Sequence, residues 1–286
     1  MAFVTILLLA PTGCSFRQLA ARTMAGSFED FQRAFDREES PAMARAAAPA
    51  LLKMLDGLIE SDPHNRDLLL QAAQMNAAFA FALIEEEDPA WARTLYAKAR
   101  WYALTALRGH KRLRSTLARA REDEVRSAIA KLQRRDAPAL FWLGQAWGSM
   151  INLDRQNPGA LSDLPAVAAI MERVRELRPD YFFGGPDLFF GIFLGGRGTM
   201  LGGDPRRSRQ AFEWAVARGH GRFLMARYHY ARVWAVQNQD RALCERELRA
   251  IIDAPLPDPP EMRLANAVAR ERAAEFLKTI ADHFVE

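Results

Sequence analysis

The segment DPRRSRQAFEWA, residues 204–215, carries the pattern from which the fold is predicted. Asp204 is suited to cap the N-terminus of a helix, and Pro205 to occupy its first position, where the missing N–H of proline has no consequence. Ser208, Phe212 and Ala215 then follow at offsets of +4, +8 and +11 from Asp204. This spacing puts a small, a large and a small side chain on one face of a helix. It is typical of the second helix of a tetratricopeptide (TPR) repeat.

The same pattern recurs elsewhere in the chain. The offsets give Ala92, Tyr96 and Ala99 after Asp88, then Val167, Met171 and Val174 after Asp163, and Cys244, Leu248 and Ile251 after Asp240. The first-helix positions of the repeat are mostly lost, so the repeats are degenerate. The sequence therefore predicts an all-α fold in which residues 14–286 form a single domain of TPR-like helical hairpins, stacked into an α-solenoid. An ordinary helical bundle with well-capped helices is the alternative.

Composition and charge agree with a folded helical protein. Half of the residues are hydrophobic and the formal net charge is +4, with acidic residues interspersed along the chain. The most basic stretch, residues 108–135, has no interleaved aromatic residues, and Glu122 and Arg126 are spaced to form an ion pair on a solvated helix face. We therefore expect no nucleic-acid partner.

The N-terminus carries a targeting pattern. Residues 2–10 (AFVTILLLA) form an apolar run that is too short to span a bilayer but suits the core of a signal peptide. The following Pro11-Thr12-Gly13-Cys14 resembles a bacterial lipobox, although Pro11 stands where leucine is usual and no basic residue precedes the apolar run. We expect residues 1–13 to be a lipoprotein-type signal peptide and Cys14 to be acylated. The alternative is a buried apolar segment with an incidental cysteine.

No pattern for catalysis or metal binding is found. The chain has only two cysteines, Cys14 and Cys244, and its five histidines lack the HExxH or i, i+4 spacing of metal ligands. The glycine-rich stretch at 195–203 is not followed by Gly-Lys-Ser/Thr, so we interpret Gly202-Gly203 as the turn before the Asp204 cap. The sequence predicts no catalytic residue, no metal, no cofactor and no enzyme activity.

The densest aromatic stretch spans residues 181–193. Its ligand or pore candidates are Tyr181, Phe189, Phe190 and Phe193. Pro186 is expected at the first position of a helix, which would leave Phe182 and Phe183 outside it. Aromatic residues at helical spacing are more often plain core, which is the alternative.

Three blocks together resemble a known family, the TatT component of TRAP transporters. They are residues 64–107, residues 139–215 with WLGQAW, ALSDLP, RPDYFFGG and MLGGDPRRSRQAFEWA, and residues 222–284 with GRFLMARYHYARVWA and EMRLANAVARERAAEFL. The local departure is GIFLGGRGTMLGG at 191–203, where the family has a Ser-Leu-Pro-like stretch.

The resemblance implies a function that the residue patterns alone do not give. It implies a periplasmic lipoprotein, anchored in the bacterial cell envelope, with cryptic TPR motifs. It also implies a homo-oligomeric ring, a trimer, around an apolar pore that passes a small apolar ligand, and docking to the substrate-binding P-component of the transporter. A generic TPR-type scaffold for envelope proteins is the alternative function.

Overall fold

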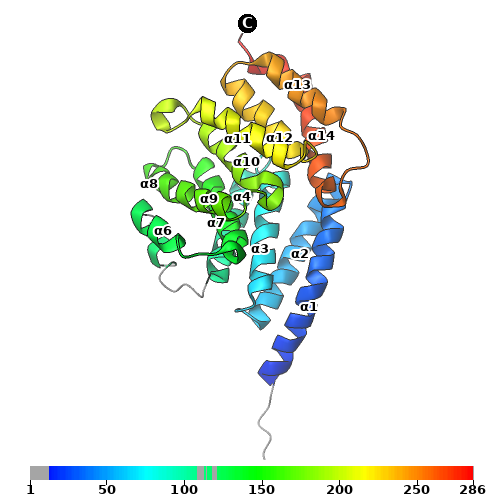
Figure 1. The fold of residues 1–286 in the computed structure, drawn as a ribbon. Helices are drawn as coiled ribbons and strands as arrows, with labels where there is room; N and C mark the ends of the chain where they lie inside the picture. Colours follow the sequence, from blue (N-terminus) through cyan, green and yellow to red (C-terminus); the bar gives the residue numbers. More distant parts are fainter. Residues whose placement is uncertain (1–12, 108–112, 114, 118–120, 286) are drawn as a thin grey trace, which may run out of the picture.

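The computed structural model describes residues 13–107, 113, 115–117 and 121–285 (Figure 1). This part of the chain is built of helices joined by turns, and it contains no strand, so the predicted all-α class is confirmed. The expected signal peptide lies almost entirely outside the described residues, and so does the side chain of Cys14.

The N-terminal half consists of long helices that pair with their neighbours in sequence. The elements are α1 (Gly13–Asp36), α2 (Pro41–Ser61), α3 (Arg66–Phe79) with the π-helical turn η1 (Ala80–Ile84), α4 (Pro89–Ala106), α6 (Glu122–Ile129), η2 (Arg134–Asp136), α7 (Ala137–Asn152), α8 (Pro158–Ser162) and α9 (Leu164–Leu177). The segment Arg66–Ile84 is apolar and long enough to cross a membrane by length and composition alone, and 67% of it is buried inside this fold.

The C-terminal half returns towards the first helices. It contains α10 (Tyr181–Gly195), η3 (Thr199–Leu201), α11 (Pro205–Arg218), α12 (Leu224–His229), η4 (Tyr230–Ala235), α13 (Arg241–Ile252), η5 (Pro260–Met262), α14 (Arg263–Lys278) and η6 (Ile280–His283). Helix α14 packs against α12 and α13 and also touches α1 and α2 (Figure 1). The chain thus curls so that its last long helix lies beside its first two.

Three of the four predicted caps are confirmed. The side chains of Asp88, Asp204 and Asp240 accept hydrogen bonds from the backbone N–H three residues on, at 2.9, 3.0 and 2.9 Å. The cap predicted at Asp163 is wrong, because the short helix α8 ends there and leaves Asp163 with helical backbone angles. Its carboxylate instead accepts a hydrogen bond from Trp147 Nε1 at 3.1 Å.

The side chains that follow these aspartates are buried as the pattern predicts. Each of Ala92, Tyr96, Ala99, Val167, Met171, Val174, Ser208, Phe212, Ala215, Cys244, Leu248 and Ile251 has 0% of its surface exposed. The Phe212 ring shows how such a position works. A Cβ added to Gly191 of α10 would stand 2.7 Å from that ring. The missing side chain of Gly191 therefore creates the groove that the ring fills.

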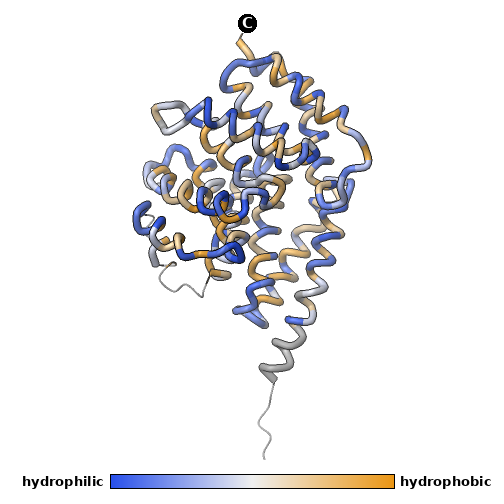
Figure 2. The backbone as a smooth tube through the Cα atoms, in the orientation of Figure 1, coloured by the Kyte–Doolittle hydropathy of each residue, from blue (hydrophilic) through white to orange (hydrophobic). Residues whose placement is uncertain are grey.

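The helices bury two hydrophobic cores, which meet at α10. One core is built mainly from α1 to α9 and also includes Phe189 and Phe190 of α10 and two residues of α14. The other is built from α10 to α14 and η6 and includes Leu188. Figure 2 shows the hydrophobic residues mostly on the inward sides of the helices and the hydrophilic ones on the turns and outer faces. Phe81 and Phe182 pack against both cores. The junction between the cores is therefore aromatic, and it surrounds a cavity.

Candidate functional site

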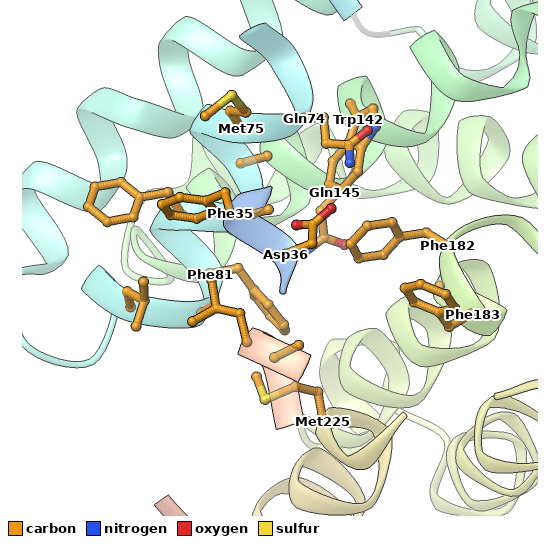
Figure 3. Close-up of a pocket in the computed structure, with 18 of the residues that line it drawn as sticks. Phe35, Asp36, Gln74, Met75, Phe81, Trp142, Gln145, Phe182, Phe183 and Met225 are labelled. Atoms are coloured by element: carbon orange, nitrogen blue, oxygen red, sulfur yellow. The ribbon is translucent and has the colours of Figure 1, made fainter. Parts of the chain in front are cut away.

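An apolar cavity of about 220 Å³ lies between the two cores. Its wall is drawn from α1, α2, α3, η1, α7, α10, the start of α12, η5 and α14, so that helices from both ends of the chain enclose it. Figure 3 shows Asp36 in the middle of the lining residues, with Phe35 and Phe81 on one side and Phe182 and Phe183 on the other. A concave, mostly apolar site with few polar groups is the usual form of a small-molecule site.

One wall of the cavity is a continuous run of aromatic rings. The ring centroids of Trp142 and Phe182 are 4.9 Å apart, those of Phe182 and Phe183 are 5.4 Å apart, and those of Phe183 and Phe223 are 5.1 Å apart. Behind this wall, Trp142 Nε1 donates a hydrogen bond to the hydroxyl of Tyr181 at 3.1 Å, which holds the indole in place. Burial raises the pKa of Tyr181, so its hydroxyl stays protonated.

The wall depends on an unusual backbone at the start of α10. Phe182, Phe183 and Gly184 all have left-handed backbone angles, with φ of 48°, 58° and 83°. This conformation costs bulky residues about 1–2 kcal/mol each. The regular helix begins only after this turn, as the position of Pro186 predicted. The turn directs the rings of Phe182 and Phe183 into the cavity instead of along the helix (Figure 3).

The glycines that follow make this turn possible. A Cβ on Gly184 would stand 2.9 Å from the Cβ of Arg218, and one on Gly185 would stand 2.7 Å from the ring of Phe141. Because neither glycine has a side chain, α10 approaches both α7 and α11 closely.

The sequence-predicted ligand residues lie behind the cavity wall and are not among its lining residues. Phe189 and Phe193 stack with their centroids 5.3 Å apart, and Phe189 fits over Gly148 of α7. The guanidinium of Arg175 lies 4.7 Å from the ring of Phe190, and that of Arg197 lies 3.9 Å from the ring of Phe193. The face of α10 that meets the cavity instead carries Leu188 and Ile192. A ligand role for Tyr181, Phe189, Phe190 and Phe193 stays a prediction.

The polar side chains of the cavity were not among the sequence-predicted site residues, although Gln74 and Gln145 lie within the blocks that resemble the family. Gln32 and Asp36 of α1, Gln74 of α3, Gln145 of α7 and Glu261 of η5 line it. Burial raises the pKa of the Asp36 carboxyl to about 6. Asp36 belongs to the polar run DREES at 36–40, which is typical of an exposed helix end, so the sequence gives no sign of its position at a cavity.

A buried histidine and a group of ion pairs near the surface lie behind Phe81. The imidazole of His229 stacks on the Phe81 ring with centroids 4.8 Å apart, and burial holds its pKa well below the usual range, which keeps it neutral. The carboxylate of Glu86 forms ion pairs with the guanidinium groups of Arg232, at 3.0 Å, and Arg272, at 3.5 Å. The ring contact joins η1 to α12, and the ion pairs join the turn after η1 to η4 and α14. The two halves of the chain are therefore held together by charge as well as by apolar packing.

No group of three or more potential metal ligands occurs among the described residues. Cys244 is buried with its thiol unpaired, and burial raises its pKa to about 12, which keeps it protonated. The cavity itself offers carboxylates, amides and aromatic faces, which suit the binding of a small molecule.

Comparison with known proteins found a distant relative and a family match. A relative from Treponema pallidum (strain Nichols), described only as an uncharacterized protein, is 21% identical over 314 aligned residues that cover 100% of this chain and 97% of its own. The profile of the family described as "TRAP transporter T-component" matches residues 37–284, which include nearly all of the described helices. The chain therefore belongs to the TRAP transporter T-component family.

Proposed function

We propose that this protein is an accessory binding component of a TRAP-type uptake system that holds a small, largely apolar ligand in its cavity. The observation that carries this proposal is the cavity of about 220 Å³ between the two cores, lined by aromatic rings and only a few polar side chains. Backbone strain at Phe182 and Phe183, on the wall of that cavity, supports it further, because strained residues cluster at functional sites.

The proposal extends to the assembly around this cavity. The protein docks the periplasmic solute-binding P-component and passes the ligand to or from it. It acts as a homo-oligomeric ring, a trimer, anchored in the cell envelope by acylation of Cys14. Its helices stack as degenerate TPR-like hairpins in one domain, and the burial of every patterned side chain after the four aspartates supports that repeat assignment.

The test is identification of what the purified protein carries. We expect native mass spectrometry to detect a non-covalent apolar adduct, and solvent extraction to release it for identification. A pull-down from periplasmic extract is expected to capture a solute-binding protein. Protein that is free of any adduct and captures only other envelope proteins would favour a generic scaffold instead.

The anchor has its own test. Wild-type protein expressed with its complete N-terminus should incorporate radiolabelled palmitate and sediment with membranes, and Cys14→Ala should do neither. Labelling of the Cys14→Ala variant would show that another residue is acylated, and no labelling of the wild type would rule out the lipid anchor. Neither result bears on the ligand proposal.

A further inference from the structure

The cavity is acidic on balance, although most of its wall is apolar. Among the described residues that line it, the ionisable ones are Asp36 and Glu261, and none is a lysine or an arginine. Its other polar side chains are the amides of Gln32, Gln74 and Gln145. A ligand carboxylate would find no cation to pair with here, and burial of an unpaired charge is costly.

Asp36 is placed where a carboxylate is least stable. It is the last residue of α1, at the negative end of the helix dipole, and it projects among the rings of Phe35, Phe182 and Phe183 (Figure 3). No hydrogen bond or ion pair joins its carboxylate to another residue in the described part of the chain. Asp36 is partly buried. A carboxylate held without a partner against an apolar cavity lowers the stability of the protein, so its presence there indicates a role in binding.

The charged groups of the neighbouring elements leave Asp36 unpaired. On α2, Arg45 bonds Glu87 at 2.6 Å, and at the start of α14, Arg263 bonds Glu39 at 3.3 Å. Neither arginine lines the cavity. The polar lining residues of α3 and α7 are the glutamines Gln74 and Gln145, and η5 contributes the carboxylate of Glu261. Arg33 of α1 and Arg37, which directly follows α1, are also absent from the described lining residues.

We propose that the ligand is a cationic amphiphile, with an apolar body against the aromatic wall and a protonated amine bonded to the Asp36 carboxylate. This inference rests on the proposed ligand-binding function and adds the chemical class of the ligand. The ammonium supplies the missing counter-charge. Its remaining N–H groups can donate hydrogen bonds to the amide oxygens of the glutamines. The apolar body excludes water from the pair, which strengthens it.

The test compares three probes that share one alkyl chain: octylamine, octan-1-ol and octanoate. Each is titrated into the protein by isothermal calorimetry at about pH 8, where an alkylamine is protonated. We expect octylammonium to bind about tenfold or more tightly than octanol, as a charge-assisted hydrogen bond predicts, and octanoate to bind most weakly. Asp36→Asn should reduce octylammonium to the level of octanol and leave octanol unchanged.

The matched control is Glu29→Gln, which removes an exposed carboxylate from the same helix and should leave all three affinities unchanged. Lowering the pH through about 6 protonates Asp36, so the octylammonium affinity should fall while that of octanol stays constant. Tighter binding of octanoate, or an amine preference that survives in Asp36→Asn, would overturn this inference and leave the ligand cavity standing. If none of the three probes binds, the proposed ligand-binding function fails together with it.

Discussion

At the scale of single residues, Asp36 opposes the stability of the fold. The physical reason is burial, which raises the pKa of its carboxyl from 3.8 to about 6. A carboxyl whose pKa is raised in the folded state destabilises the protein above that pKa, because folding then removes a charged group in part from water. The penalty disappears as the pH falls, because the folded state then binds the proton more readily than the unfolded state does. Binding sites commonly hold such unfavourable groups at the expense of stability.

We therefore expect Asp36→Asn to be more stable than the wild type at about pH 7.5, by about 1–3 kcal/mol. Urea unfolding followed by circular dichroism measures this difference. It should shrink as the pH is lowered through about 6 towards 4. Glu29→Gln, at an exposed site on the same helix, should show no such pH-dependent difference. Equal stability of Asp36→Asn and wild type at every pH would mean that the carboxylate is solvated or paired.

At the scale of elements, α10 divides its two faces between core and cavity. Phe189, Phe190 and Phe193 pack towards α7 and α9, whereas Leu188 and Ile192 face the cavity. The aromatic composition and the position of Pro186 predicted a helix here. They did not predict the left-handed turn before the helix. Contacts with α7 and α11 hold that turn, and no local sequence pattern indicates it.

The turn makes Gly184 a sensitive position. Gly184→Ala should destabilise the protein by about 1–3 kcal/mol, since φ is +83° and the added Cβ would stand 2.9 Å from the Cβ of Arg218. Gly57→Ala is the matched control: it lies on an exposed part of α2 with no atom within 4 Å of the added Cβ, and it should stabilise by about 0.5–1 kcal/mol. Thermal unfolding of both variants decides the matter. A Gly184→Ala protein as stable as Gly57→Ala would show that the turn relaxes freely.

At the scale of the whole molecule, the helices could be predicted from the sequence but the cavity could not. Aspartate caps and small–large–small spacing are local, and three of the four caps form as their spacing predicts. The cavity arises only when α14 returns to α1 and α2, which brings together residues as far apart in sequence as Asp36 and Leu264. No local sequence pattern predicts that α14 packs against α1 and α2.

Because the cavity joins both halves of the chain, its occupancy should govern the stability of the whole fold. A ligand that binds only the folded state raises the free energy of unfolding by RT ln(1 + L/Kd), where L is the free ligand concentration, so the melting temperature rises with that concentration. Octan-1-ol, which carries no charge, should therefore raise the melting temperature of the wild type progressively with concentration. This prediction depends on the cavity alone and not on the charge of Asp36.

The substitution Ala78→Phe tests whether occupancy of the cavity governs the stability of the fold. Ala78 lies on α3 at the cavity wall and is partly exposed there, so a phenylalanine can extend into the empty space without displacing a packed neighbour. Filling a cavity replaces lost packing contacts, and the variant should therefore be at least as stable as the wild type without ligand. It should no longer gain stability from octan-1-ol, because the binding volume is occupied. Ala97→Phe, at an exposed site on α4, should keep the full ligand response. If Ala78→Phe folds and still responds like the wild type in differential scanning calorimetry, the ligand binds elsewhere and the cavity is not the functional site.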